Sequence, residues 1–119
     1  MLSIGFEKCA EVQAYLDTVI GDFDLKYIPS TGEYVEIINK EFDKGKGLRK
    51  LAGLLGADGN RVFAVGDGEN DLEMLEAASL AFVPANGCMA AKAKKHVDVP
   101  SNDEFAVAHA IDYIESVLC

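Results

Sequence analysis

Four acid or amide side chains follow one another closely in the segment Gly66-Asp67-Gly68-Glu69-Asn70-Asp71, which comes directly after a short apolar run. The pattern is typical of a buried strand that ends in a glycine-flanked loop and leads into a helix. In a parallel sheet, ligands bind in the crevice at the carboxyl ends of the strands. Carboxylates gathered there repel one another unless a cation joins them, and their hard oxygen atoms suit Mg²⁺. Asp67 and Asp71 are therefore the candidate metal ligands.

The same loop also has a purely structural interpretation, in which Gly66-Asp67-Gly68 is a turn and Asp71 caps the next helix. Two other ligand loops are excluded by their spacing. Counted from Asp67, the sixth and twelfth positions of a calcium-binding EF-hand fall on Leu72 and Ala78 instead of Gly and Glu. A dinucleotide-binding fingerprint needs a third glycine where Asp71 stands. The loop by itself leaves the metal site and the structural turn as alternatives.

Lys44 stands where a second helix is expected to begin, in Asp43-Lys44-Gly45-Lys46-Gly47-Leu48. The first N–H groups of a helix are unpaired, and a lysine beside them adds a positive charge, so such a position suits a phosphate group. No Ser or Thr follows the lysine in the frame of a nucleotide-binding P-loop. A surface lysine without a ligand is the alternative interpretation.

The chain is acidic, with 119 residues and a net charge of −9 from 20 acidic and 11 basic residues. The negative electrostatic potential of such a chain repels nucleic acids and anionic membranes, so neither is an expected partner. No apolar run approaches the ~20 residues that span a bilayer, and the first residues do not resemble a signal peptide. The three cysteines have no metal-ligand spacing, and free thiols suit a reducing compartment. We expect a cytoplasmic location.

The elements that must position these residues follow from apolar periodicity. Helices are expected over 8–21, 45–56 and 71–78, and a last one follows a capping box formed by Ser101 and Glu104. Its apolar stripe would comprise Val107, Ala110, Ile111, Ile114, Val117 and Leu118. Strands are expected over 2–6, over 25–28 and 34–38 as a hairpin, over 62–65 and 80–83 as parallel neighbours, and from Val97.

The order of elements changes near residue 43. Before it, the order strand, helix, hairpin is typical of a small α+β unit with an antiparallel sheet. After it, helices and strands alternate, as in a parallel α/β sheet. The sequence therefore predicts two partial units, 1–43 and 44–119.

The two motifs taken together carry a family resemblance. Lys-Gly-x-x-Leu, a helix, an apolar strand and Gly-Asp-Gly-x-Asn-Asp-x-x-Met-Leu resemble the haloacid dehalogenase superfamily of phosphohydrolases, above all its Cof-type branch with an α/β cap. The resemblance implies an α/β fold in which residues 44–119 form the C-terminal half of a Rossmannoid parallel-sheet core. Residues 1–43 would be the C-terminal part of the cap.

The resemblance also implies roles for individual residues. Lys44 would contact the substrate phosphate and steady the nucleophile. Asp67 would hold Mg²⁺, Asp71 would be a ligand or its supporting partner, and Asn70 would help to order the metal site. Asn86 would bind phosphate from the turn after residues 80–83, although Phe82-Val83-Pro84-Ala85-Asn86-Gly87 lacks the small residues that usually surround this asparagine.

The family's nucleophile is absent from these 119 residues. It is an aspartate in an Asp-x-Asp-Gly-Thr motif that forms an aspartyl-phosphate, while the second aspartate acts as general acid and base. Asp22-Phe23-Asp24 does not replace it, because it follows a helix and Lys26 stands where Thr or Val belongs. We interpret Asp22 and Asp24 as exposed residues at a helix end.

The resulting hypothesis is the C-terminal portion of a Mg²⁺-dependent phosphomonoester hydrolase that acts on sugar phosphates or similar small metabolites. Without the nucleophile, the chain is expected to be inactive alone. The alternative is a non-enzymatic module that binds Mg²⁺ or phosphate, or that self-associates. Self-association is expected in either case, since a partial core leaves apolar strands uncovered.

Overall fold

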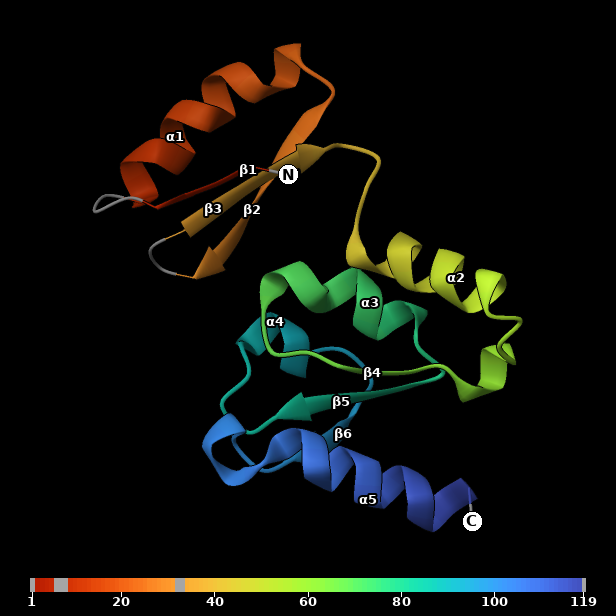
Figure 1. Ribbon diagram of the computed structural model, residues 1–119. Helices are drawn as coiled ribbons and strands as arrows, with labels where there is room; N and C mark the ends of the chain where they lie inside the picture. The colour runs from red at the N-terminus through yellow and green to blue at the C-terminus, as the bar shows by residue number, and fades with distance from the viewer. Residues whose placement is uncertain (1, 6–8, 32–33, 119) are drawn as a thin grey trace. The chain divides into compact units, whose positions relative to one another are not determined.

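The computed structural model describes residues 2–5, 9–31 and 34–118 and divides into two compact units, Met1–Asp43 and Lys44–Cys119 (Figure 1). Each unit has its own sheet and its own helices. None of the helices in the described ranges has the length and apolar character of a membrane span.

The first unit is built on an antiparallel sheet in the order β1-β3-β2. Its elements are β1 (Leu2–Gly5), α1 (Cys9–Val19), the 3₁₀ turn η1 (Ile20–Asp22), β2 (Leu25–Thr31) and β3 (Tyr34–Asn39). The predicted hairpin is confirmed, but β2 runs on beyond the expected end at residue 28. A shift of register between Pro29 and Thr31 accommodates the proline, which has no N–H to donate.

The first unit also settles the position of the acidic pair that resembles the nucleophile motif. Asp22 ends η1 and Asp24 follows in a turn, and both are exposed. They lie at a helix end and not at the end of a buried strand, as the sequence indicated.

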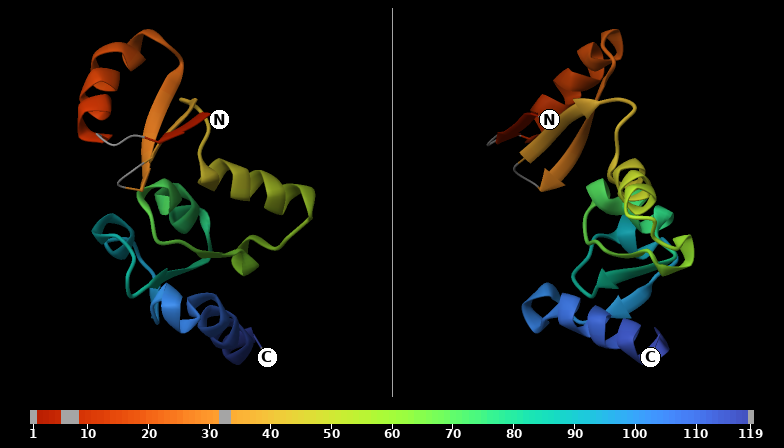
Figure 2. Two further views of the ribbon diagram at one scale, coloured as in Figure 1. Left: turned by 60° about the vertical axis from the view of Figure 1, so that its left-hand side comes forward. Right: turned by 45° about the vertical axis from the view of Figure 1, so that its right-hand side comes forward.

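The second unit is built on a parallel sheet in the order β4-β5-β6 (Figure 2). Its strands are β4 (Phe63–Val65), β5 (Leu80–Pro84) and β6 (Val97–Val99). The α/β fold class and the parallel pairing of the two apolar runs are therefore confirmed. Because the strands are parallel, their carboxyl ends lie at one edge of the sheet.

Side chains of successive strand residues point to opposite faces of this sheet, and each face has its own core. α3 (Leu72–Ala77) and α4 (Met89–Lys92) cover one face, and α5 (Ala106–Leu118) covers the other (Figures 1 and 2). The buried residues of the first face are Ala64, Leu75, Ala81, Val83 and Ala91. Those of the second face are Phe82, Val99, Ala106 and Ala110.

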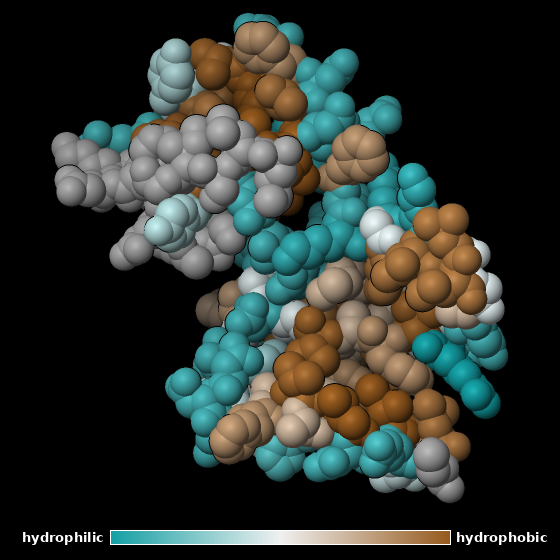
Figure 3. Space-filling model, in the orientation of Figure 1, coloured by the Kyte–Doolittle hydropathy of each residue, from teal (hydrophilic) through white to brown (hydrophobic). Residues whose placement is uncertain are grey.

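The helix α2 (Lys44–Leu54) carries the predicted phosphate lysine at its first residue and packs on α3. Gly45 permits this packing, because a Cβ there would lie 2.3 Å from the backbone oxygen of Glu73. After the helix, Gly56 adopts a positive φ of 62° that favours glycine. Apolar surface remains over α2 and the turn after it (Figure 3), where Leu51, Leu54 and Leu55 are exposed.

The prediction for the last helix was wrong in two respects. Ser101 caps the 3₁₀ turn η4 (Asn102–Glu104), and the left-handed Phe105, with φ of 61°, separates that turn from α5. The predicted stripe also divides. Ala110 is 1% exposed and packs on the sheet, whereas the next residue, Ile111, is 51% exposed. Neighbouring residues differ by about 100° around a helix, and the face of α5 that meets the sheet is centred on Ala106 and Ala110, so Ile111 stays at its exposed margin.

Candidate functional site

Three loops meet at the carboxyl edge of the parallel sheet. Asp67 follows β4, Asn86 follows β5 and Asn102 follows β6. Backbone hydrogen bonds hold the strand ends together, from Gly66 N to the carbonyl of Phe82 (3.1 Å) and from Ala85 N to the carbonyl of Val99 (2.9 Å). Residues that are far apart in the sequence therefore become neighbours at this edge.

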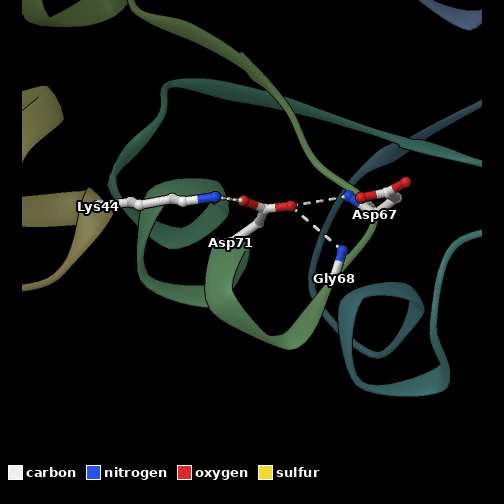
Figure 4. A network of polar contacts seen from close by, with 4 residues as sticks. All are labelled: Lys44, Asp67, Gly68 and Asp71. Atoms are coloured by element: carbon white, nitrogen blue, oxygen red, sulfur yellow. Dashed lines mark hydrogen bonds and ion pairs between the residues drawn. The ribbon is translucent and has the colours of Figure 1, made fainter. Parts of the chain in front are cut away.

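Asp71 connects the acidic loop to the lysine. Its Oδ1 accepts a hydrogen bond from Lys44 Nζ at 2.5 Å, and its Oδ2 accepts from the N–H groups of Asp67 and Gly68, each at 3.1 Å (Figure 4). Asp71 is only 7% exposed, whereas the Lys44 side chain is 48% exposed. The carboxylate thus uses Oδ2 to fix the backbone of the acidic loop and Oδ1 to hold the ammonium group of Lys44 beside that loop.

Opposing influences act on the pKa of Asp71. Burial, the largest of them, raises it, because a charged group loses solvation in the interior. The hydrogen bond and charge of Lys44, with the N–H groups of Gly68 and Asp67, stabilise the ionised form and together lower the pKa below its ordinary value of 3.8. Asp71 is therefore ionised at neutral pH and forms a true ion pair with Lys44.

The glycines of the loop make room for these contacts. A Cβ at Gly66 would lie 2.7 Å from the Cβ of Asp71, and a Cβ at Gly68 would lie 2.7 Å from Oδ1 of Asn70. No side chain fits at either position without displacing the functional groups beside it. The amide oxygen of Asn70 thus lies close to Gly68, within the acidic loop.

Asp67 has different surroundings. It is exposed, and its Oδ2 accepts a hydrogen bond from Asn102 Nδ2 at 2.8 Å. Its backbone carbonyl accepts from the N–H of Cys88 at 2.8 Å. Asn86 joins the same cluster, since its Oδ1 accepts from the N–H of Asn102 at 3.0 Å. Asn102 was not among the site residues predicted from the sequence, although its place after β6 resembles that of Asp67 after β4.

A small open cavity of about 210 Å³ lies at this edge, and Asp67, Asp71 and Asn102 are among the residues that line it. Within the described ranges, no three His, Cys, Asp or Glu side chains converge as a complete metal site. Mg²⁺ does not need such a cage, because it commonly binds one or two carboxylates and completes its shell with water and phosphate oxygens. The exposed carboxylate of Asp67 fits part of such a ligand set, and the amide oxygen of Asn70 lies beside Gly68 in the same loop.

Comparison with known proteins identifies the family. The sequence profile of the haloacid dehalogenase-like hydrolases matches residues 5–111. A phosphoglycolate phosphatase of Methanosarcina acetivorans is 40% identical over 95 residues, which are 79% of this chain and 41% of that protein. A chloroplastic endoribonuclease, YBEY, of Arabidopsis thaliana is 36% identical over 100 residues, which are 84% of this chain and 17% of that protein.

A solved structure of a haloacid dehalogenase-like hydrolase also has a similar fold. A haloacid dehalogenase-like hydrolase from Bacillus subtilis superimposes with a TM-score of 0.79 and 26% identity, over 92% of this chain and 39% of that structure. The chain spans less than half the length of each of these three proteins. The profile nevertheless covers most of both units and includes Lys44, Asp67 and Asp71. The chain belongs to the haloacid dehalogenase-like hydrolases.

Proposed function

We propose that this chain supplies the lysine and metal-loop half of a Mg²⁺-dependent phosphomonoester hydrolase whose substrates are sugar phosphates or similar small metabolites. One observation carries the proposal: the Lys44–Asp71 ion pair lies in the same loop cluster as the exposed Asp67, at the ligand-binding edge of a parallel sheet. A phosphatase of phosphoglycolate, a small phosphorylated acid, is among the relatives.

Lys44 has the role of binding the phosphate group. Its ammonium group has three donors, of which one is directed to Asp71, and the side chain remains half exposed. A phosphate oxygen approaching from solvent therefore meets a charge that is already held in place. Asp71 acts indirectly, because its two oxygens are occupied by the lysine and the loop backbone.

Asp67 is the proposed metal ligand, and Asn70 supports the loop beside it. Bound Mg²⁺ would supply positive charge that neutralises a phosphoryl group and helps to orient it. Asp67 suits that task because it is exposed and no cation of the chain neutralises its carboxylate among the described contacts. Asn86 contributes to phosphate binding from the neighbouring loop, where its Oδ1 accepts a hydrogen bond from the N–H of Asn102.

The nucleophile must come from a polypeptide segment outside these 119 residues. The Asp-x-Asp-Gly-Thr motif is absent from the sequence, and Asp22 and Asp24 lie in the first unit at a helix end. We assign residues 1–43 to the end of a cap domain and residues 44–119 to the closing half of the catalytic core. The 119-residue chain therefore binds phosphate but does not hydrolyse phosphomonoesters by itself. A cytoplasmic location is part of the same proposal.

Phosphate binding tests this proposal. Titration of the chain with inorganic phosphate in the presence of Mg²⁺ should shift the amide NMR signals of residues 44 and 66–71. Lys44→Ala should weaken that binding about tenfold, because a charge-assisted hydrogen bond contributes about 1.5–3 kcal/mol. Lys50→Ala, which removes an exposed lysine from the same helix, is the matched control and should bind like the wild type.

Two results would contradict the proposal. One is phosphate binding that is equal in the wild type and Lys44→Ala. The other is rapid Mg²⁺-dependent turnover of p-nitrophenyl phosphate by the purified 119-residue chain, which would place a nucleophile within these residues.

We further propose that the isolated chain self-associates. β4 is an edge strand of the described parallel sheet, where its one hydrogen-bonded neighbour is β5. Several apolar side chains of α2 and α5 are also exposed. An unpaired apolar strand edge is a template for pairing with another chain. Sedimentation equilibrium should show the average mass rising with concentration. A single monomeric species at every concentration would contradict this expectation.

A further inference from the structure

We propose that Asn102 is a positioning residue that holds the carboxylate of Asp67 ready for a cation. The inference rests on the proposed function, because it concerns the same metal site, and it assigns a task to a residue outside both sequence motifs. Asn102 Nδ2 lies 2.8 Å from Asp67 Oδ2. An ionised carboxylate only accepts hydrogen bonds, so the amide must present its N–H₂ group to it.

The kind of donor matters as much as its place. Asp71 receives a cationic partner, Lys44, which cancels its charge locally. Asp67 receives a neutral amide, which fixes the orientation of the carboxylate but leaves its negative charge in place. Only one carboxylate oxygen is used by this bond, so the other remains for a cation. The exposed aspartate is thus oriented without being neutralised.

Asn102 is itself held in place from two sides. Its N–H donates to Oδ1 of Asn86 at 3.0 Å, which ties it to the loop after β5. It is the first residue of η4, whose preceding residue, Ser101, accepts a hydrogen bond at Oγ from the N–H of Asp103. The three loops at the sheet edge are therefore joined through one residue, Asn102, whose backbone N–H contacts Asn86 and whose side chain contacts the Asp67 carboxylate.

Groups that hydrogen-bond a metal ligand typically change metal affinity by 10–100-fold, because they hold the ligand in its binding orientation before the metal arrives. Mn²⁺ is a suitable probe, since it takes the same oxygen ligands as Mg²⁺ and broadens nearby NMR signals. In the wild-type chain, Mn²⁺ should selectively broaden the amide signals of residues 66–71. Asn102→Ala should need about tenfold more Mn²⁺ for the same broadening.

Two variants separate positioning from a merely structural effect. Asn102→Gln and Asn102→Ala change the same position of the turn, but only glutamine keeps an amide donor. Asn102→Gln should therefore recover most of the affinity that Asn102→Ala loses. Asp103→Asn changes the next residue of the same turn and should bind Mn²⁺ nearly as the wild type does. Urea unfolding of all variants should show that the loss of affinity in Asn102→Ala exceeds any loss of folded protein.

The outcomes distinguish the inference from the function on which it rests. Localised broadening in the wild type with unchanged affinity in Asn102→Ala overturns the role of Asn102 and leaves the metal site standing. Equal weakening in Asn102→Ala and Asn102→Gln also overturns it, because the donor would then be irrelevant. Absence of localised broadening in the wild type overturns the proposed metal site, and the inference with it.

Discussion

Asp67 and Asp71 lie on the same loop, four residues apart, but their carboxylates have different surroundings. Asp71 is buried, both of its oxygens accept hydrogen bonds, and a lysine balances its charge. Asp67 is exposed, and one of its oxygens accepts a hydrogen bond from a neutral asparagine. Among the described contacts, no cation pairs with its charge.

The two aspartates therefore have different tasks, which the sequence of acidic residues in the loop does not reveal. A carboxylate whose hydrogen-bonding capacity is filled by the protein stabilises the loop and orients its partner, here Lys44. A carboxylate that is oriented but still charged is able to attract a cation. Replacing Asp71 should therefore mainly lower stability, whereas replacing Asp67 should mainly weaken ligand binding.

The largest expected effect is the loss of stability in Asp71→Ala. The substitution leaves the N–H groups of Asp67 and Gly68 and the ammonium group of Lys44 without their common acceptor, which should lower the free energy of unfolding by about 3 kcal/mol. Asp67→Ala is the matched variant and should cost less than about 1 kcal/mol, because its carboxylate is exposed. Urea denaturation measures both.

The contrast between the variants is the informative result. Equal destabilisation by the two substitutions would show that the loop depends on both carboxylates in the same way. It would remove the distinction between a structural aspartate and an aspartate that is available for a ligand. Mn²⁺ titration of Asp67→Ala, which should remain folded, then reports the second task without interference from the first.

Much of this site could be predicted from the sequence. The apolar runs of residues 62–65 and 80–83 indicated parallel strands, and the glycines and acids after the first run indicated a loop at their carboxyl edge. Lys44 stood out because it stands at the expected start of a helix. Each of these signals is local, since it depends on residue types within a few positions of one another.

The remaining features depend on distant contacts. Asn102 lies 35 residues from Asp67, and the bond between them requires β4, β5 and β6 to pair in their observed register. The exposed part of α5 was mispredicted for a related reason. Its apolar residues are compatible with burial, but Ala106 and Ala110 are the ones that meet the sheet. Periodicity identifies apolar faces without showing which partner covers them.

A smaller effect should appear on acidification, and it tests the ionic character of the Asp71 contact. The folded-state pKa of Asp71 lies below its ordinary value of 3.8, so the folded state binds this proton less readily than the unfolded state does. The stabilisation is therefore fully present above about pH 3.8 and is lost as the pH falls through the lower folded-state pKa. Asp71→Asn keeps the shape of the side chain but has no charge to lose.

Urea unfolding of the wild type and of Asp71→Asn across this pH range isolates the contribution of one group from that of the other acidic residues, which titrate in both proteins. The difference in stability between the two should be constant near neutral pH and should shrink below about pH 3.8. A difference that persists unchanged into strong acid would mean that Asp71 acts as a neutral hydrogen-bonding group. The contrast with Asp67 would then be one of burial alone, without the charge pairing that leaves Asp67 as the cation-seeking carboxylate of the loop.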